Sequence, residues 1–314
     1  MADAYLGLTE LILLNDMNLA DLEMTDLLQD APFLAQLHAE IASNGTKHSY
    51  LVEDGAPVVG FRAINAGREN KKSSDRQVDV TLMILAATFS VDQQLPKNYR
   101  KGEAEFMSRE ARRHLKAAFS AAEKQIIYGT GNDADGFTGM AQATTVDALA
   151  DTDHVVDAGG TSVGAATSVW AIRSPNDGTG VCAILGQDGE ITIGEYFSQL
   201  LQDGDGKDYP GYVQPIEGYM GMQVGSAYDM ARIVNLTTQA GKGLSDTLMS
   251  KLLEKFPASR PPTHFIMNRQ SRGQLQRSRT ATRTDGADAP LPADYQGIPI
   301  ITTDSILNTE ALVA

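Results

Sequence analysis

The stretch "IIYGTGNDADGFTGM", residues 126–140, decides how this sequence is read, because one kind of structure ends there and another begins. It contains four glycines and two aspartates, and it follows a long run in which apolar residues recur every three or four positions. Stretches of this kind occur as phosphate-binding turns, as calcium loops and as corners between elements. Each of the three makes a different demand on the flanking sequence.

The first two interpretations meet those demands poorly. Residues 129–134 match the dinucleotide fingerprint G-x-G-x-x-A, but that fingerprint needs a strand before it and a helix after it, whereas here a helical run precedes it and none follows. As a calcium loop, residues 131–142 place a glycine at the first ligand position and Gln142 where a bidentate carboxylate is needed. Residues 201–212 fail in the same way. We therefore expect no cofactor and no metal ion, and a nicotinamide-dependent enzyme is the weakest functional interpretation.

The run before the glycines predicts a long amphipathic helix over residues 103–127. Its apolar residues share one face, namely Met107, Ala111, Leu115, Ala118, Phe119, Ala122 and Ile126. The other face is assigned to Arg112, Arg113, Lys116, Glu123 and Lys124. A helix of this length extends for about 37 Å, which indicates a structural spine.

Residues 46–92 predict a long β-hairpin. Two segments rich in Val, Ile, Phe, Thr and Tyr flank the charged sequence "GRENKKSSDR" at residues 67–76. This predicted tip carries Arg68, Lys71, Lys72 and Arg76 and no apolar anchor. Because a hairpin of this length is marginal alone in water, we expect it to lie against a surface outside its own domain.

Smaller elements are predicted before and after these two. One or two short helices, broken near Pro32, are expected over residues 8–43, and residues 150–235 are rich in strands and turns. The last part of the sequence predicts an amphipathic helix at 245–256, a strand at 263–268, a short helix at 269–277 and a final strand at 297–304.

The composition is that of an ordinary globular protein whose acidic charge is unevenly spread. Hydrophobic residues make up 42% and charged residues 21% of the 314 positions, which is enough to bury a sizeable core. The net charge is −14, and residues 1–46 contain eight acids and no Lys or Arg, whereas residues 97–124 contain eight bases against four acids. These segments are solvated faces, or acidic and basic parts that meet across subunits. So acidic a chain is a poor candidate for wrapping nucleic acid.

The sequence also limits where the protein is found. Its single cysteine, Cys182, excludes an internal disulfide and favours a reducing compartment. No basic segment precedes the first apolar residues, and the longest apolar run, residues 82–87, is too short to span a bilayer. We expect neither a signal peptide nor a membrane association.

One stretch resembles a catalytic motif. The sequence "GTSVG", residues 160–164, matches the nucleophile elbow G-x-S-x-G, with Ser162 as nucleophile and His264 as the only histidine downstream. The elbow needs a strand, a sharp turn and then a helix, but "GAATSVWAI" predicts a return to strand. We expect a structural turn here and keep a serine hydrolase as the alternative function.

Taken in order, these elements resemble the major capsid protein of tailed bacteriophages, which has the Hong Kong 97-type fold. "IIYGTGNDADGFTGM" is similar to the junction that closes the spine helix of that family. "FIMNRQSRGQLQ" and "YQGIPIITTDSI" resemble its apical domain, where a strand, an "N-R" helix and a "G-x-P-V/I" strand recur. "VVDAGGTSVGAATSVWAI" with "ARIVNL" is similar to coat proteins of short-tailed phages of the epsilon-fifteen type.

The resemblance implies an α+β fold and a division of the chain into five parts. These are an N-terminal arm at 1–45, an extended β-hairpin loop at 46–92, a peripheral domain with spine helix and corner at 93–143, a β-rich peripheral segment at 144–240 and an axial domain at 241–314. In the prototype the β-rich segment follows the "G-x-P-V" strand, whereas here only 14 residues follow Ile300. The resemblance therefore implies permuted connectivity. It makes the opening stretch a corner, formed by Gly129, Gly131, Gly136 and Gly139.

The implied function is that of a structural subunit without catalysis, which assembles into the icosahedral head shell around double-stranded DNA. Its partners would be further copies in hexamers and pentamers, a separate scaffold protein, a portal and decoration proteins. The protein would be made in the host bacterial cytoplasm and end in the virion. Besides the four basic residues of the tip, we expect the assembly interface to use Arg109, Arg112, Arg113 and Lys116.

Overall fold

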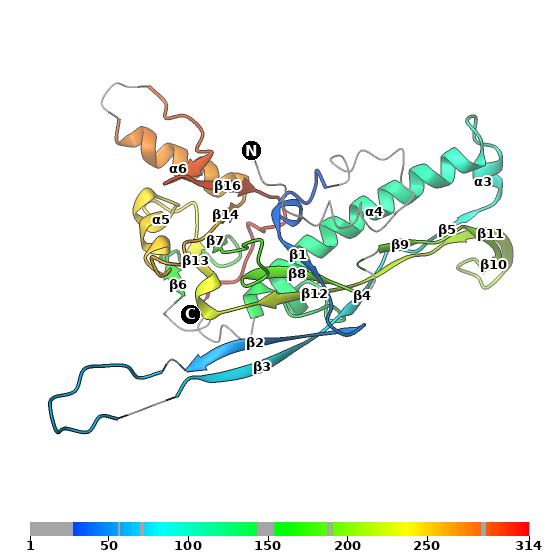
Figure 1. Cartoon of the computed structure of the whole chain (residues 1–314). Coiled ribbons are helices and arrows are strands. Elements are labelled where there is room, and N and C mark those ends of the chain that lie inside the picture. The colour runs from blue at the N-terminus through cyan, green and yellow to red at the C-terminus, as the bar shows by residue number, and fades with distance from the viewer. Residues whose placement is uncertain are drawn as a thin grey trace, which may run out of the picture.

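Helix α4 (Glu103–Tyr128) is the longest element of the computed structural model and lies along its β-sheets (Figure 1). The structure describes residues 28–55, 57–69, 72–142, 154–186, 189, 191–283 and 287–313. The apolar face predicted for the helix is buried, from Met107 to Ile126, so the spine prediction is confirmed. Glu123 was assigned to the solvent face, and this was wrong: its side chain is fully buried. Its position, four residues after Phe119, places it on the apolar face.

The sheet beside α4 is assembled from segments that lie far apart in the sequence. Its strand order is β1 (Ala39–Ile41), β8 (Val181–Leu185), β12 (Ile216–Val224) and β4 (Met83–Ala86), and β9 (Ile191–Ile193) also pairs with β12. Only β1 and β8 run parallel. One apolar core joins this sheet to α4 and to residues before β1, including Phe33 and Leu34.

A three-stranded sheet continues this body toward the N-terminal end of α4 (Figure 1). It contains β10 (Phe197–Gln202), β11 (Asp208–Gln214) and β5 (Phe89–Asp92), and the short helix α3 (Gln94–Lys97) follows β5. The Phe89 ring stacks on His114 of α4, with 4.7 Å between ring centroids. This stacking attaches the sheet to the spine.

A six-stranded sheet lies at the C-terminal end of α4. Its order is β15 (Asp294–Tyr295), β16 (Ile298–Thr302), β14 (His264–Met267), β7 (Thr167–Ile172), β13 (Met230–Leu236) and β6 (Val155–Asp157). Helices α5 (Asp246–Leu253) and α6 (Arg269–Ala281) share a second core with it. The helices and strands predicted after residue 244 are confirmed. Strands on both sides of residue 240 share this sheet, so the boundary predicted there does not separate two sheets.

The hairpin of β2 (Lys47–Gly55) and β3 (Ser74–Thr81) projects from the body (Figure 1). The sequence predicted a hairpin up to residue 92, but its second strand divides into β3, β4 and β5, which join three different sheets. The break follows Thr81, where Leu82 turns inward to only 3% exposure and its backbone N–H donates to the carbonyl of Thr46. Burial of Leu82 thus ends the hairpin at the body.

The segment before the hairpin is less helical than predicted. Of the helices expected over residues 8–43, the part up to residue 27 lies outside the described residues. The rest contains one 3-10 turn, η1 (Leu34–Gln36), and then strand β1.

Further 3-10 turns among the described residues are η2 (Gly129–Gly131), η3 (Met140–Gln142) and η5 (Ala227–Asp229). Within the described residues, no helix has the length and apolar character that crossing a bilayer requires.

Candidate functional site

The glycine corner after α4 is closed by close backbone contact. Gly129 ends the helix at φ 56°, a left-handed conformation that favours glycine. A Cβ on Gly129 would lie 2.2 Å from the backbone nitrogen of Gly139, and a Cβ on Gly139 would lie 2.3 Å from that of Gly129. A Cβ on Gly136 would lie 2.2 Å from Nε2 of Gln125. Gly131 also lies in the corner, but its position does not require glycine, because its φ is not positive and a Cβ there would meet only Gln142 Nε2, at 4.0 Å.

Backbone N–H and carbonyl groups of this corner form hydrogen bonds with side chains of the same chain. Gln125 Nε2 donates to the carbonyl of Phe137 at 2.8 Å, and Gln142 Oε1 accepts from the backbone N–H of Thr130 at 2.8 Å. Asp133 Oδ1 accepts from the N–H of Asp135 at 3.0 Å, as expected of a turn former. No group of three or more metal-ligating side chains occurs among the described residues. The corner is therefore a structural junction at the end of the spine helix.

The hairpin ends in a loop whose apolar side chains face solvent. Val59 is 82%, Phe61 107% and Ile64 91% exposed, and Val58 is also exposed. Arg68 braces this loop: its Nη1 donates to the carbonyl of Gly60 at 2.9 Å, and its Nη2 donates to that of Val58. We call residues 57–69 the hairpin tip. Exposed apolar side chains gathered in this way indicate a contact with another molecule.

From the sequence we expected the tip at residues 67–76, without apolar anchors. That position was wrong, because the loop begins after Gly55 and includes exposed apolar residues. The strand ends at Gly55, so the apolar residues that follow belong to the loop rather than to a strand. Among the predicted interface residues, Lys72 is exposed beyond the tip, Arg76 is exposed within β3, and Lys71 lies outside the described residues. Pro57, Gly60 and Gly67 interrupt the apolar run and could have suggested a loop.

Three of the four basic residues predicted on the spine, Arg109, Arg113 and Lys116, have partners within the same chain. Lys116 Nζ lies 3.2 Å from Asp30, and Arg113 Nη1 lies 2.8 Å from Glu110. The guanidinium of Arg109 lies 5.1 Å from the centre of the Tyr99 ring. Arg112 is half-buried, and no described group pairs with its Nε. The attraction between acidic arm and basic spine is therefore present within one subunit, at Asp30.

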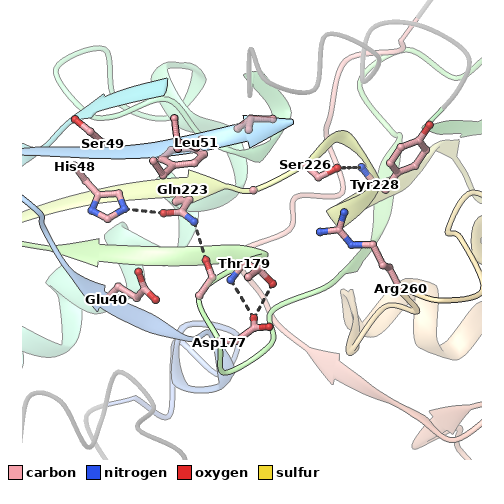
Figure 2. A pocket seen from close by; sticks show the side chains of 14 residues that line it. Glu40, His48, Ser49, Leu51, Asp177, Thr179, Gln223, Ser226, Tyr228 and Arg260 are labelled. Carbon is pink, nitrogen blue, oxygen red and sulfur yellow. Dashed lines mark hydrogen bonds between the residues drawn. The ribbon is translucent and has the colours of Figure 1, made fainter. Parts of the chain in front are cut away.

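A polar groove of about 750 Å³ lies beside the base of the hairpin (Figure 2). His48 of β2 contacts Gln223 of β12 through Nε2 and Oε1 at 2.8 Å, and Gln223 Nε2 donates to the carbonyl of Gly178 at 2.8 Å. Asp177 accepts from the backbone N–H and the hydroxyl of Thr179. The contact between His48 and Gln223 fixes the hairpin base to the body, and the other bonds hold Gln223 and the turn at Asp177 in place.

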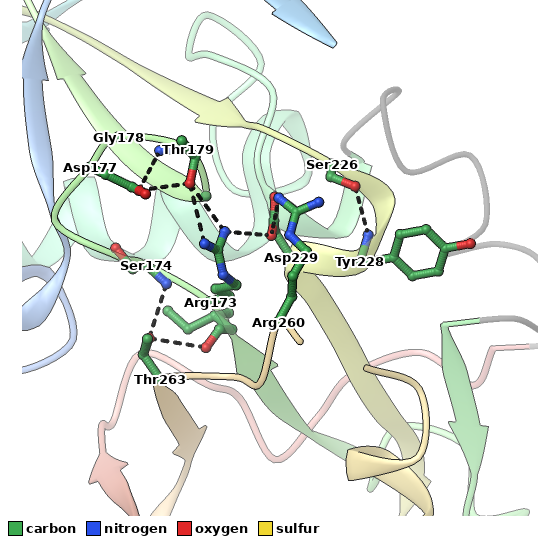
Figure 3. A network of polar contacts seen from close by, with 12 residues as sticks. Arg173, Ser174, Asp177, Gly178, Thr179, Ser226, Tyr228, Asp229, Arg260 and Thr263 are labelled. Carbon is green, nitrogen blue, oxygen red and sulfur yellow. Dashed lines mark hydrogen bonds and ion pairs between the residues drawn. The ribbon is translucent and has the colours of Figure 1, made fainter. Parts of the chain in front are cut away.

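Next to this groove, Asp229 forms a buried ionic cluster (Figure 3). Its side chain is fully buried, and Oδ1 lies 3.1 Å from Arg173 Nη1 and 3.4 Å from Arg260 Nη2. Burial raises the pKa of Asp229, against the opposing effect of the two arginines. The cluster lies where the connections β7–β8 and β12–β13 pass between the two large sheets. Sequence reasoning missed it, since no local pattern marks these residues.

A second buried carboxylate, Glu123, joins three parts of the chain. It accepts the backbone N–H groups of Phe33 and Leu34 at 2.9 and 3.0 Å, and it also accepts the hydroxyl of Thr303. Burial raises the pKa of Glu123, although these hydrogen bonds act to lower it. The end of the arm, the spine helix and the segment after β16 thus meet at one side chain.

The structure does not bring together the pair that a hydrolase would need. Ser162 lies in the loop before β7, where Thr161 donates its backbone N–H to Gln239 at 3.0 Å. His264 pairs with Ile172, at the other end of β7, about 17 Å along the strand from Thr167. Strand follows the loop instead of the helix that an elbow requires. The expected structural turn is confirmed.

Comparisons with known proteins agree with a structural role for this chain. The model of the family "Major capsid protein GP7" matches residues 21–314. Among solved structures, the chain is similar to bacteriophage Epsilon15, with 18% identity, a TM-score of 0.60 and 88% of each chain covered. It is also similar to the bacteriophage JBD30 capsid, with 13% identity, a TM-score of 0.51 and coverage of 90% of this chain and 94% of that chain. Among curated proteins, none matches the chain.

Proposed function

Because the chain belongs to the major capsid protein GP7 family, and is thereby a subunit of a bacteriophage head shell, we propose that its projecting hairpin makes the principal contact between neighbouring copies in that shell. Head-shell formation and a place in the virion agree with the function and location predicted from the sequence. The proposal concerns the surfaces that hold the copies together.

The apolar hairpin tip carries this proposal. Phe61 and Ile64 are almost fully exposed, and they stand at the end of two paired strands that lead away from the body. Leaving such side chains in water forgoes about 1.5–3 kcal/mol each compared with burial. A neighbouring subunit that covers them supplies the burial that their own subunit does not.

The roles of the five predicted segments also belong to this proposal. The arm, the extended hairpin, the spine, the β-rich segment and the axial sheet would meet their counterparts in hexamers and pentamers. A separate scaffold protein, a portal and decoration proteins would be further partners, and double-stranded DNA would be enclosed without sequence-specific contacts. The net charge of −14 supports a wall that does not grip the packaged DNA.

The proposed function includes no catalysis, and a serine variant tests this. Ser162→Ala should leave assembly and stability unchanged, because the residue lies in a loop between elements. Neither the parent nor the variant should react with a serine-directed fluorophosphonate probe. Labelling of the parent that disappears in the variant would contradict the purely structural role.

The assembly proposal is tested with the full chain, alone and together with a scaffold protein from the same phage. Size-exclusion chromatography and negative-stain electron microscopy should find capsomers or shells. A chain that stays monomeric in both settings would contradict the proposed function.

A further inference from the structure

A trough lies between the base of the hairpin, the glycine corner and β12. It consists of two adjoining cavities of about 410 and 100 Å³ that share Met83, Gly136 and Phe137. Other apolar side chains along it are Val78, Val80, Ile84, Met220 and Met222. We call this surface the corner trough. It is open, its apolar side chains lie beside threonines and acids, and Ile84 on its wall is 59% exposed.

The charged residues along the corner trough are all acidic. They are Asp79 of β3 and Asp133 and Asp135 of the corner, and no Lys or Arg is among the described residues that line it. The hydrogen bond from Gln77, followed by one from Ser49, lowers the pKa of Asp79, so that it is ionised at neutral pH. A suitable occupant is therefore apolar at its centre and basic at its edge.

The hairpin tip has this complementary character. Its exposed apolar side chains are Val58, Val59, Phe61 and Ile64. Arg62 and Arg68 lie among them against a single acid, Glu69, and Lys72 follows. The tip and the trough thus match in hydrophobicity and are opposite in charge.

The tip does not reach the trough of its own chain. Strand β2 has nine residues, so it spans about 30 Å, and Figure 1 shows the hairpin projecting away from the body. A second copy can bring a tip to the trough. Because tip and trough are different surfaces, such a contact is head-to-tail and closes into a ring when the rotation between copies allows it.

We propose that the corner trough of one subunit is the receptor for the hairpin tip of the next subunit, with the phenyl and aliphatic side chains of the tip between β4 and the corner, and Arg62 facing Asp135. This inference rests on the proposed function and names the surface that receives the hairpin. The polar groove beside His48 is the less suitable receptor, because Arg260 lines it and its polar groups bond to one another.

Engineered cysteines test the contact within assembled shells. Cys182 is fully buried, so it does not compete with introduced thiols. Ala63→Cys in the tip combined with Ala134→Cys in the trough should give, after mild oxidation, a ladder of disulfide-linked oligomers on a non-reducing gel. Ala63→Cys combined with Leu51→Cys, which lines the polar groove instead, should give no ladder. Shells without a ladder from the first pair would overturn the inference and leave the proposed function standing.

A charge exchange provides a second test. Arg62→Asp and Asp135→Arg should each abolish shell formation, and the double variant should restore it, because the pair then attracts again with reversed signs. Circular dichroism should find all three variants folded, since Asp135 is exposed and contributes only its backbone N–H to the corner. Shells from both single variants would contradict the proposal, as would a double variant that is no better than either single one. A parent chain that never forms shells would instead refute the proposed function.

Discussion

At the scale of single residues, Glu123 joins three distant parts of the chain. This carboxylate, without an ion-pair partner among the described residues, is held by two backbone N–H groups and by the hydroxyls of Thr303 and Ser305. The sequence contained a signal for it, because position 123 lies four residues from both Phe119 and Ile127, on the buried face. Its partners could not be predicted, since Phe33 and Thr303 lie 90 and 180 residues away.

The raised pKa of Glu123 predicts an unusual pH dependence. The ordinary value is 4.5, and a higher value in the folded state means that the folded chain binds this proton more tightly than the unfolded chain. The free energy of unfolding therefore loses this contribution as pH rises from 4.5 through the raised pKa. Glu123→Gln removes the titration, so urea denaturation at several pH values should find the parent losing stability relative to the variant as pH rises. Glu105→Gln, at an exposed position of α4, is the control and should follow the parent. Parallel profiles for the parent and Glu123→Gln would contradict the prediction.

Substitutions of two nearby corner glycines, Gly129 and Gly131, should have very different effects on the free energy of unfolding. Gly129→Ala should destabilise the subunit by about 1–3 kcal/mol or more, because its backbone conformation is unfavourable for alanine and the Cβ meets Gly139. Gly131→Ala should change the free energy of unfolding by less than about 0.5 kcal/mol, because its Cβ would make only an ordinary van der Waals contact with Gln142 Nε2, at 4.0 Å. Thermal or urea unfolding measures both. Equal effects of the two substitutions would mean that the corner is built differently.

At the scale of elements, periodicity predicted α4 well and the hairpin less well. The helix has a one-sided apolar pattern over seven turns, whereas a run of β-branched residues is compatible with one strand or with several. Thus residues 76–92 were read as one strand, although they supply β3, β4 and β5. The pairing that divides them comes from β12 and β11, which lie 119 residues or more later in the chain. Local sequence does not contain that information.

Introducing an aspartate at two positions of helix α4 should have opposite effects on folding. Leu115 is fully buried in the core around α4, so Leu115→Asp would bury an unpaired charge at a cost of several kcal/mol and should yield no folded subunit. Arg113→Asp, two residues earlier and exposed, should stay folded, because an exposed ion pair contributes only about 0–1 kcal/mol. Soluble yield and circular dichroism distinguish the two. A folded Leu115→Asp subunit would show that this face is not buried.

At the scale of the whole molecule, the order of elements predicted the family, and the match over residues 21–314 confirms it. The fold class followed from the same order, because each motif is short and their succession is specific. The surfaces that hold copies together were less predictable, since exposure of the tip depends on where β2 ends. Three of the four basic spine residues of the predicted interface, Arg109, Arg113 and Lys116, have partners in their own chain, and the role of all four between subunits stays a prediction.

Removing the hairpin tip should separate folding from assembly. Residues 56–73 can be replaced by Asn-Gly, a two-residue turn suited to the paired ends Gly55 and Ser74. The subunit should keep its circular dichroism spectrum and melting temperature, because none of the apolar cores of the described residues contains a tip residue. Electron microscopy should find no shells. Normal shells from this variant would mean that the tip contacts no neighbour.

The distant pairing in the central sheet has a consequence for the chain during synthesis. Strand β1 pairs with β8, and β8 pairs with β12, so the sheet is incomplete until Val224 has left the ribosome, about 185 residues after Ala39. At roughly 5–20 residues per second this takes about 10–40 s. Residues 57–69 are made early in that interval, so the apolar side chains of the hairpin tip are exposed on an unfinished chain for most of it. The nascent protein is therefore most vulnerable to aggregation before its core exists, and its yield should depend on chaperones that act during translation.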